Sequence, residues 1–309
     1  MAPAFPPDRE DQLYVSVKPI VAGNMFLPHK EVFQDSIDLP ESEGVRIPVF
    51  CFFISHPTEG DALFDLGVRK HVEGYPPSLQ DEPRTYFDAV CEEDVTDHLK
   101  KGGVDPANIR NIFLSHLHWD HTGDATPFTS ATLTISAEAK TLLETNVYPK
   151  NPEGSIPAFP EGNAITYVNF ESTTSRPVIA PFVTFERGID IYGDGSLYMV
   201  DTPGHYPGHY SLVARVAPDS FLFMAADLCH NRLCYAPGHR ILSKLNYADV
   251  ETARKSAQRL AALNREVDNV VVILAHETQR TEEGMPFFPN DVREWVVEEI
   301  EKRKNVIRP

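Results

Sequence analysis

The most informative stretch of the chain reads Ser115-His116-Leu117-His118-Trp119-Asp120-His121-Thr122-Gly123-Asp124. Two imidazoles two residues apart in an extended segment can point to one side, and a carboxylate and a third imidazole follow within one turn. Neutral imidazole and carboxylate are the ligands that suit zinc and neighbouring transition metals. Four such side chains, His116, His118, Asp120 and His121, therefore predict a metal site rather than a polar loop with chance histidines.

Three further candidate ligands stand where the pattern predicts the ends of strands. His205 lies in the stretch 201–209, whose Pro-Gly pairs mark tight turns that can aim a side chain inward. Asp227 and His276 each follow a continuous apolar run. A carboxylate at the end of a buried strand is costly unless it is paired or metal-bound. Together with the first cluster, these residues predict a site for two metal ions, with His209 in a structural role beside it.

The chain is acidic, with 45 Asp and Glu residues against 28 Lys and Arg and a formal charge of −17. The negative electrostatic potential of such a chain repels phosphate backbones and anionic membrane surfaces, so we expect neither a nucleic acid nor a membrane as a partner. No run of about 18 apolar residues is present, and residues 1–11 are too rich in proline and charge for a signal peptide. We therefore expect a cytoplasmic protein that acts on a small, neutral and partly apolar substrate.

Hydrophobic periodicity outlines two groups of strands. Apolar or alternating runs predict strands at 15–21, 45–54, 61–65, 111–114, 132–135, 196–201, 211–216, 221–225 and 270–275. Helical spacing is found at 137–145, 249–265 and 292–304, the last two with Asp249 and Asn290 as predicted N-caps. Strands grouped in both halves, each closed by a helix, indicate an α/β fold of two sheets packed face to face with helices outside. We expect residues 1–309 to form a single domain.

Two proline-containing stretches, 68–95 and 148–190, show few regular apolar periods. Loops of this length in a compact domain are usually functional or mobile. We interpret both stretches as insertions that line a substrate pocket, with surface decoration or a contact between two copies of the chain as alternatives. A homodimer formed through these insertions is the expected assembly.

The pattern that runs from Phe64-Asp65-Leu66-Gly67 to His276 resembles the metallo-β-lactamase-fold superfamily. Residues 114–124 are especially similar to N-acyl homoserine lactonases and their fungal lactonase and lactamase relatives. The antibiotic-degrading zinc enzymes carry a Cys ligand where this chain presents Asp227. The resemblance implies an αββα sandwich of two mixed sheets and a hydrolase that opens a small cyclic ester or amide (a lactone, a lactam or a cyclic carbamate).

The resemblance also implies how the ligands divide between two divalent metal ions, most simply Zn²⁺. One metal would be held by His116, His118 and His205. The other would be held by Asp120, His121 and His276. The carboxylate of Asp227 would bridge the two metals. Two metals about 3.5–4 Å apart can acidify a bridging water, polarise the scissile carbonyl and stabilise the leaving atom. Attack by the resulting hydroxide needs no covalent protein intermediate, and Asp120 is expected to relay a proton.

One position departs from the lactonase pattern. Homoserine lactonases typically place a Tyr three residues after the bridging Asp, whereas this chain has His230 there. An imidazole can donate a hydrogen bond or protonate a leaving group near neutral pH. The candidate catalytic residues are therefore Asp120 and His230, and a surface histidine on a loop is the alternative for His230.

Other residues receive supporting roles. Asp65, after a strand and before a glycine, is expected to stabilise the metal site from behind, and Trp119 to wall the pocket. The candidate substrate contacts are Asn231, Arg232 and Lys244.

Two other classes of function stay open at this point. A thioesterase resembling glyoxalase II, or one that releases acyl chains from a carrier, is the first alternative. Glyoxalase II has a basic C-terminal region, whereas residues 298–301 here read Glu-Glu-Ile-Glu. Acyl carriers are acidic, so charge repulsion disfavours them too. A metal-binding module without turnover, or an oxidoreductase with one iron, is the second alternative, and the full set of ligands argues against it.

Overall fold

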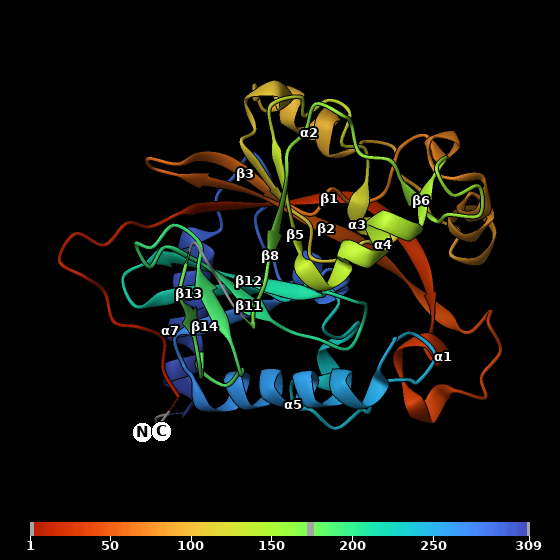
Figure 1. The fold of residues 1–309 in the computed structure, drawn as a ribbon. Coiled ribbons are helices and arrows are strands. Elements are labelled where there is room, and N and C mark those ends of the chain that lie inside the picture. Colours follow the sequence, from red (N-terminus) through yellow and green to blue (C-terminus); the bar gives the residue numbers. More distant parts are fainter. Residues whose placement is uncertain (1–2, 172–175, 308–309) are drawn as a thin grey trace.

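Two six-stranded sheets form the centre of the structure, a computed structural model that describes residues 3–171 and 176–307 (Figure 1). The first sheet has the order β1-β2-β3-β4-β5-β8. Its first three strands pair antiparallel and the others pair parallel. The strands are β1 (Ser16–Pro28), β2 (Gly44–His56), β3 (Gly60–Phe64), β4 (Asn111–Phe113), β5 (Thr132–Ser136) and β8 (Ile165–Val168).

The second sheet has the order β14-β13-β12-β11-β10-β9. Only β13 and β14 pair parallel, so this sheet is mixed as well. The strands are β9 (Val178–Ile179), β10 (Gly188–Asp190), β11 (Leu197–Asp201), β12 (Tyr210–Ala217), β13 (Ser220–Met224) and β14 (Val270–Ile273). A separate pair is formed by β6 (Val147–Tyr148) and β7 (Ile156–Pro157).

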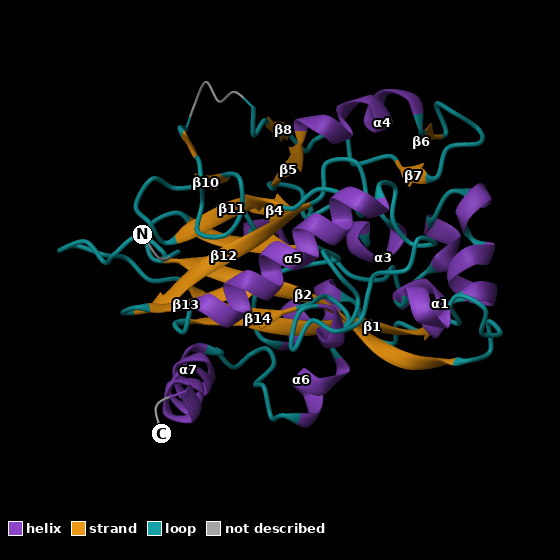
Figure 2. Cartoon of the chain, turned by 90° about the horizontal axis from the view of Figure 1, so that it is seen from below, coloured by secondary structure: helices purple, strands orange, loops and turns teal. Residues whose placement is uncertain are grey.

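Helices lie on the outside of both sheets. Those on the side of the first sheet include α2, and α5 crosses the outer face of the second sheet with α7 beside it (Figures 1 and 2). The α-helices are α1 (His29–Val32), α2 (Val95–Lys101), α3 (Trp119–Thr122), α4 (Lys140–Thr145), α5 (Val250–Glu266), α6 (Thr278–Glu282) and α7 (Arg293–Ile307). Short turns are η1 (Gln34–Ser36), η2 (Val72–Gly74), η3 (Pro77–Leu79), η4 (Glu82–Tyr86), η5 (Pro106–Asn108), η6 (Ala137–Ala139) and η7 (Arg232–Cys234). This architecture confirms the predicted α/β sandwich of two mixed sheets.

Burial on two faces explains the continuous apolar runs. In β2, Phe50 and Phe52 join the core between the sheets, whereas Cys51 and Phe53 join a second core that includes residues of α2. Successive side chains of a strand point to opposite faces, so a strand covered on both sides is apolar throughout. The same reasoning accounts for β13 and β14, all of whose residues are buried.

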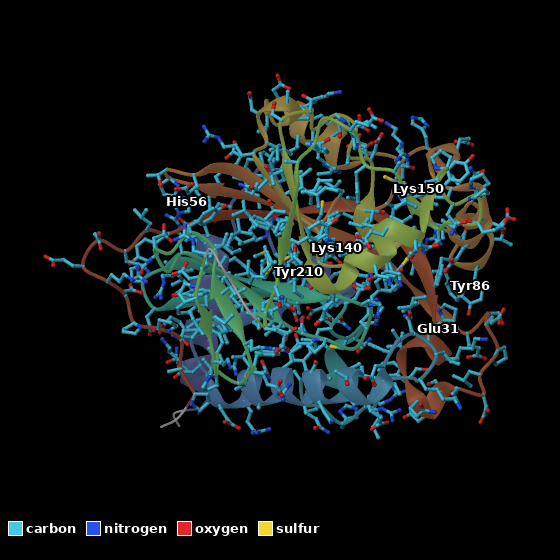
Figure 3. All side chains as sticks on the ribbon, viewed as in Figure 1. Glu31, His56, Tyr86, Lys140, Lys150 and Tyr210 are labelled. Atoms are coloured by element: carbon cyan, nitrogen blue, oxygen red, sulfur yellow. The ribbon has the colours of Figure 1, made fainter. Side chains whose placement is uncertain are left out.

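Tyr210 of β12 connects the two sheets near the centre of the molecule (Figure 3). Its hydroxyl donates a hydrogen bond to the carbonyl of Thr134 in β5, at 2.9 Å. Its backbone N–H donates to the carbonyl of Ser115, which follows β4. The second sheet is thus bonded directly to the stretch that carries the histidine cluster.

Most of the predicted strands and helices are present, with the main differences at their ends. Asp249 caps α5 as predicted, because its side chain accepts a hydrogen bond from the Thr252 N–H. The predicted cap of the last helix is wrong: Asp291, not Asn290, accepts a hydrogen bond from the Arg293 N–H. The helix α2 was not predicted; its seven residues are too few to display a clear period, although Asp94 caps it with a reciprocal capping box.

The two predicted insertions differ from each other. The stretch 68–95 contains only short turns and contributes to the wall of a pocket described below. The stretch 148–190 supplies β8, β9 and β10 to the sheets, so it is not an insertion throughout; residues 172–175 lie outside the described residues. These edge strands have two to four residues each, which is too short for a recognisable alternation. A homodimer formed through these stretches stays a prediction.

No helix in the described part of the chain combines the length and the hydropathy needed to cross a lipid bilayer.

Gly204 sets how closely the loop after β11 approaches α5. Its φ of +124° is accessible mainly to glycine, and a Cβ there would lie 2.2 Å from the Ala253 nitrogen. The Gly204 carbonyl accepts a hydrogen bond from the Asp249 N–H, and the carbonyl of His205 accepts one from the Ala248 N–H. The start of α5 therefore fixes the backbone beside His205.

We expect Gly204→Ala to lower the free energy of unfolding by at least about 2 kcal/mol, because the new methyl group meets backbone that cannot move aside. Gly103→Ala is the control: Gly103 also has a positive φ, +76°, but no atom within 4 Å of an added Cβ. It should cost only about 1 kcal/mol, the strain of the backbone alone. Urea unfolding of both variants measures the difference, and equal losses would contradict a role for close packing on α5.

Candidate metal centre

The first group of potential ligands comes from the loops after β4, β11 and β13. His116, His118, His205 and Asp227 each offer one ligand atom, and these atoms lie within 4.8 Å of one another. His118 Nδ1 lies 2.9 Å from His116 Nε2 and 2.9 Å from His205 Nε2. Asp227 Oδ2 lies 3.4 Å from His205 Nε2. Three imidazoles and a carboxylate oxygen are thus gathered around one point.

The second group contains Asp120, His121, His276 and, again, Asp227. Asp227 faces it with its other oxygen: Oδ1 lies 3.3 Å from His121 Nε2 and 3.2 Å from His276 Nε2. Asp120 Oδ2 lies 3.4 Å from His276 Nε2. The two oxygens of one carboxylate therefore face one group each, as a ligand shared by two metal ions must. The structure brings all seven predicted residues together in the predicted division.

Three buried atoms of the second group test whether the site fits a metal ion. His121 Nε2, His276 Nε2 and Asp227 Oδ1 make no hydrogen bond, and each side chain belongs to a residue no more than 2% exposed. A buried polar atom without a partner is costly. Here three such atoms approach one another, two nitrogens and one oxygen, which is a donor set that zinc and its neighbours accept. The residues present fit a pair of divalent ions.

The electrostatics of the two groups differ. In the first group, burial and the neighbouring histidines hold the pKa values of His116 and His205 well below the ordinary value, and burial lowers that of His118 to about 4. These imidazoles are neutral at physiological pH, as metal ligation requires. In the second group, burial would lower the pKa of His276, but the carboxylates of Asp227 and Asp120 raise it to about 10. The second group therefore favours positive charge at its centre.

Asp65 supports the site from the end of β3, as the sequence predicted. Its carboxylate accepts hydrogen bonds from the backbone N–H and the hydroxyl of Ser115, both at 2.7 Å. His121 Nδ1 lies 2.8 Å from Asp65 Oδ2. A carboxylate that accepts the Nδ1 proton orients the ring and leaves Nε2 facing the site.

Backbone carbonyls orient two other histidines in the same way. His205 Nδ1 lies 2.9 Å from the carbonyl oxygen of Asn246, and His276 Nδ1 lies 3.0 Å from that of Pro48 in β2. When each ring donates its Nδ1 proton to the carbonyl, its Nε2 is the atom left for a metal. The predicted structural role of His209 also agrees with the geometry. Its Nδ1 donates to the Thr202 carbonyl, and its Nε2 accepts the backbone N–H of Asp227 at 3.1 Å.

Glu277, the residue after His276, ties two ligand-bearing loops together. Its buried carboxylate accepts a hydrogen bond from Arg232 Nε at 2.6 Å and from the Leu274 N–H at 3.1 Å. Arg280 Nε also lies 3.2 Å from it. Arg232 is five residues beyond Asp227, so this ion pair joins the loop after β13 to the loop after β14. Arg232 thus has a structural role in this ion pair, and its predicted contact with the substrate stays a prediction.

His230 is buried beside the site, which excludes the alternative of a surface histidine. It is 3% exposed, and its Nε2 lies 3.1 Å from Asp227 Oδ2. Its Nδ1 lies 2.9 Å from the hydroxyl of Tyr247. When that hydroxyl donates to Nδ1, the imidazole proton resides on Nε2, on the side of the metal ligands.

A pocket of about 70 Å³ opens onto the two groups. It is lined by Met25, Leu27, Glu82, Phe87, His118, Trp119, Asp120, His205, Asp227, His230 and Asn246. Trp119 walls the pocket as predicted, whereas Asn231 and Lys244 are not among the lining residues. The sequence analysis missed Glu82 and Asn246, because neither stands in a ligand motif or after an apolar run.

Known proteins match this chain in sequence. It is 29% identical to the Cytochrome P450 monooxygenase mpaDE of Penicillium roqueforti, over 91% of this chain and 35% of that protein. It is 33% identical to the Gamma-lactamase FDB1 of Fusarium pseudograminearum, over 61% of this chain and 47% of that protein. The chain thus spans about a third of the length of the first relative and about half that of the second.

The fold also matches solved structures. One is described as "Crystal Structure and Catalytic Mechanism of the Quorum-Quenching N-Acyl Homoserine Lactone Hydrolase"; the two chains share 19% identity with a TM-score of 0.64, over 94% of this chain and 99% of that one. This likeness concerns the fold alone. In sequence, the profile of the Metallo-beta-lactamase superfamily matches residues 45–276, a span that contains all seven candidate ligands. The chain therefore belongs to the Metallo-beta-lactamase superfamily.

Proposed function

We propose that this protein is a two-metal hydrolase that opens a small cyclic ester or amide. The observation that carries the proposal is the position of Asp227, whose two oxygens face two separate groups of imidazoles at 3.2–3.4 Å. The name of one protein that this chain resembles in sequence, a gamma-lactamase, supports the choice of ring opening.

In this proposal His116, His118 and His205 hold one divalent ion and Asp120, His121 and His276 hold the other, with Asp227 shared between them. Bound there, two ions (zinc by the chemistry of the donors) would acidify a water molecule and polarise the carbonyl of the substrate. Neither group of candidate ligands contains a cysteine, which separates this set from that of the antibiotic-degrading enzymes.

The side chains around the ligands then position the ring and move protons. Nε2–H of His230 can donate a hydrogen bond to the carbonyl oxygen or to the leaving atom. Asn246 Nδ2 lies 3.4 Å from that nitrogen, so its amide can serve the same oxygen. Asp120, 5% exposed at the base of the pocket, can receive the proton that the attacking water loses. Trp119, Phe87 and Met25 keep bulk water from the reacting atoms.

The pocket argues against a thioesterase that grips an anionic substrate. Arg and Lys are absent from its described lining, so the described residues offer no cation to an anionic substrate. An acidic surface with a net charge of −17 likewise suits a neutral substrate.

A panel of substrates tests the proposed reaction. We expect the zinc-loaded protein to open at least one of a homoserine lactone, an aryl lactone, a benzo-fused lactam and a cyclic carbamate, as followed by acid release or absorbance. A chelator should abolish the activity and added Zn²⁺ should restore it, because the water is activated by metal. Thiol release from acyl thioesters without ring opening would favour the thioesterase instead. One bound iron with oxygen uptake would overturn the hydrolase.

Metal analysis tests the division of ligands. We expect about two metal ions per chain in the wild type and about one in His276→Ala or His118→Ala, since each variant removes a ligand from only one group. Asp227→Ala should hold fewer than either, because it removes the shared ligand. His71→Ala, at an exposed position, is the control and should keep the wild-type content. Equal loss of metal from all four variants would contradict the division.

The part played by His230 can be separated from metal binding. We expect His230→Ala to lower kcat about 10- to 100-fold with unchanged metal content, because a hydrogen-bond donor to the reacting oxygen or leaving atom is lost. His230→Gln retains an N–H donor and should recover part of the rate. His239→Ala, an exposed position in the same loop, should behave as the wild type. An unchanged kcat in His230→Ala would end the assignment.

A further inference from the structure

Glu82 stands apart among the residues that line the pocket. The lining contains the metal-ligand residues, the donors His230 and Asn246, and four large apolar side chains. Glu82 is the only acidic residue of the described lining outside the two ligand groups, and it comes from the stretch 68–95 rather than from a loop after a sheet strand. It therefore contributes an acceptor that metal binding does not use.

Glu82 is an exposed residue that lines the pocket. No donor or cation contacts it among the described residues, and its charged neighbours, Asp120 and Glu31, are both acidic. Burial and these two like charges raise the pKa of Glu82. Its carboxylate is thus open to solvent and available to a donor group of a ligand in the pocket.

The backbone around Glu82 is well anchored, so its position is defined. The hydroxyl of Tyr86, in the same π-helical turn η4, donates a hydrogen bond of 2.6 Å to Glu31 Oε1, and the two side chains meet at the edge of the molecule in Figure 3. The ring of Phe87, next along the chain, packs 5.8 Å from that of Trp119, which precedes Asp120. The turn is thereby fixed against both α1 and α3.

We propose that Glu82 is a specificity-determining residue that accepts a hydrogen bond from a hydroxyl or N–H group on the substrate. The substrate class is then a lactone, lactam or cyclic carbamate that carries a donor on or beside its ring. This inference rests on the proposed ring-opening function and deepens it. Substrates with an anionic substituent should bind poorly, since the described lining offers that substituent a carboxylate and contains neither Lys nor Arg.

The geometry assigns different tasks to the polar groups of the pocket. His230 and Asn246 offer N–H groups, which match the carbonyl oxygen common to every cyclic ester or amide. Glu82 offers only oxygen acceptors, which a plain lactone cannot engage. Glu82 therefore distinguishes among rings that the metal centre alone treats alike. A hydrogen bond to a charged acceptor is strong enough to make that distinction large.

Matched pairs of compounds test the inference. The first pair is an aryl lactone with one phenolic hydroxyl and its methyl ether; the second is a cyclic carbamate with a free N–H and its N-methyl derivative. We expect the zinc-loaded wild type to prefer the donor-bearing member of at least one pair by about tenfold or more in kcat/KM.

In Glu82→Leu the ratio of kcat/KM between the two members of that pair should fall to about one. In Glu82→Gln, which keeps an oxygen acceptor, the ratio should lie between these limits. Asp81→Leu removes a charge from the same segment at a residue outside the pocket lining and should leave the ratio unchanged.

Calorimetric binding of the same pairs provides a second readout that does not depend on turnover. Ring opening with the same ratio in the wild type and Glu82→Leu would overturn the role of Glu82 and leave the proposed function standing. In a second outcome, the wild type binds the donor-bearing compound more tightly, Glu82→Leu loses that preference in Kd, and no ring is opened. This would support the role of Glu82 and overturn the proposed function. Neither binding nor opening of any of the four compounds would overturn both.

Discussion

The structure depends on one buried carboxylate. Asp227 lies at the end of β13, 2% exposed, where an isolated negative charge would be strongly destabilising. Every element around it supplies compensation: imidazoles from three loops approach its oxygens, and His209 accepts its backbone N–H. Its two oxygens are used by different groups, so the requirement to neutralise a single carboxylate is also what draws two metal-binding groups to one place.

Strand ends of both sheets meet around that residue. Parallel pairing of β3 with β4 and of β13 with β14 puts Asp65, the histidine cluster, Asp227 and His276 at the carboxyl ends of strands. Direct bonds then hold the ends in register: the Glu277–Arg232 ion pair joins two loops of the second sheet, and His276 Nδ1 reaches Pro48 of the first. Rigid strand ends give the side chains a defined geometry, which metal sites and catalysis both require.

The sequence was sufficient to predict the sandwich and all seven potential ligands, because each ligand either belongs to one dense motif or follows a buried strand. The residues it missed have no such local signature. Glu82 stands in an irregular turn whose position depends on Tyr86 meeting Glu31, 55 positions away, and Tyr247 matters only because the fold brings it to His230. Edge strands β8 to β10 were missed for a related reason, since two to four residues cannot display a period. The local sequence pattern was thus enough to find the candidate ligands, whereas the residues that surround them are found only from the tertiary contacts.

The charges around the site support the proposal of a neutral substrate. Asp65, Asp120, Asp227 and Glu82 carry four negative charges when ionised, and two divalent ions carry four positive charges. In the proposed loaded site these charges would be close to balanced but separated in space, with Glu82 in the pocket wall. A field of this kind stabilises charge that develops during the reaction without attracting polyanions. The acidic surface, with a net charge of −17, would likewise favour the proposed neutral substrate over a polyanion.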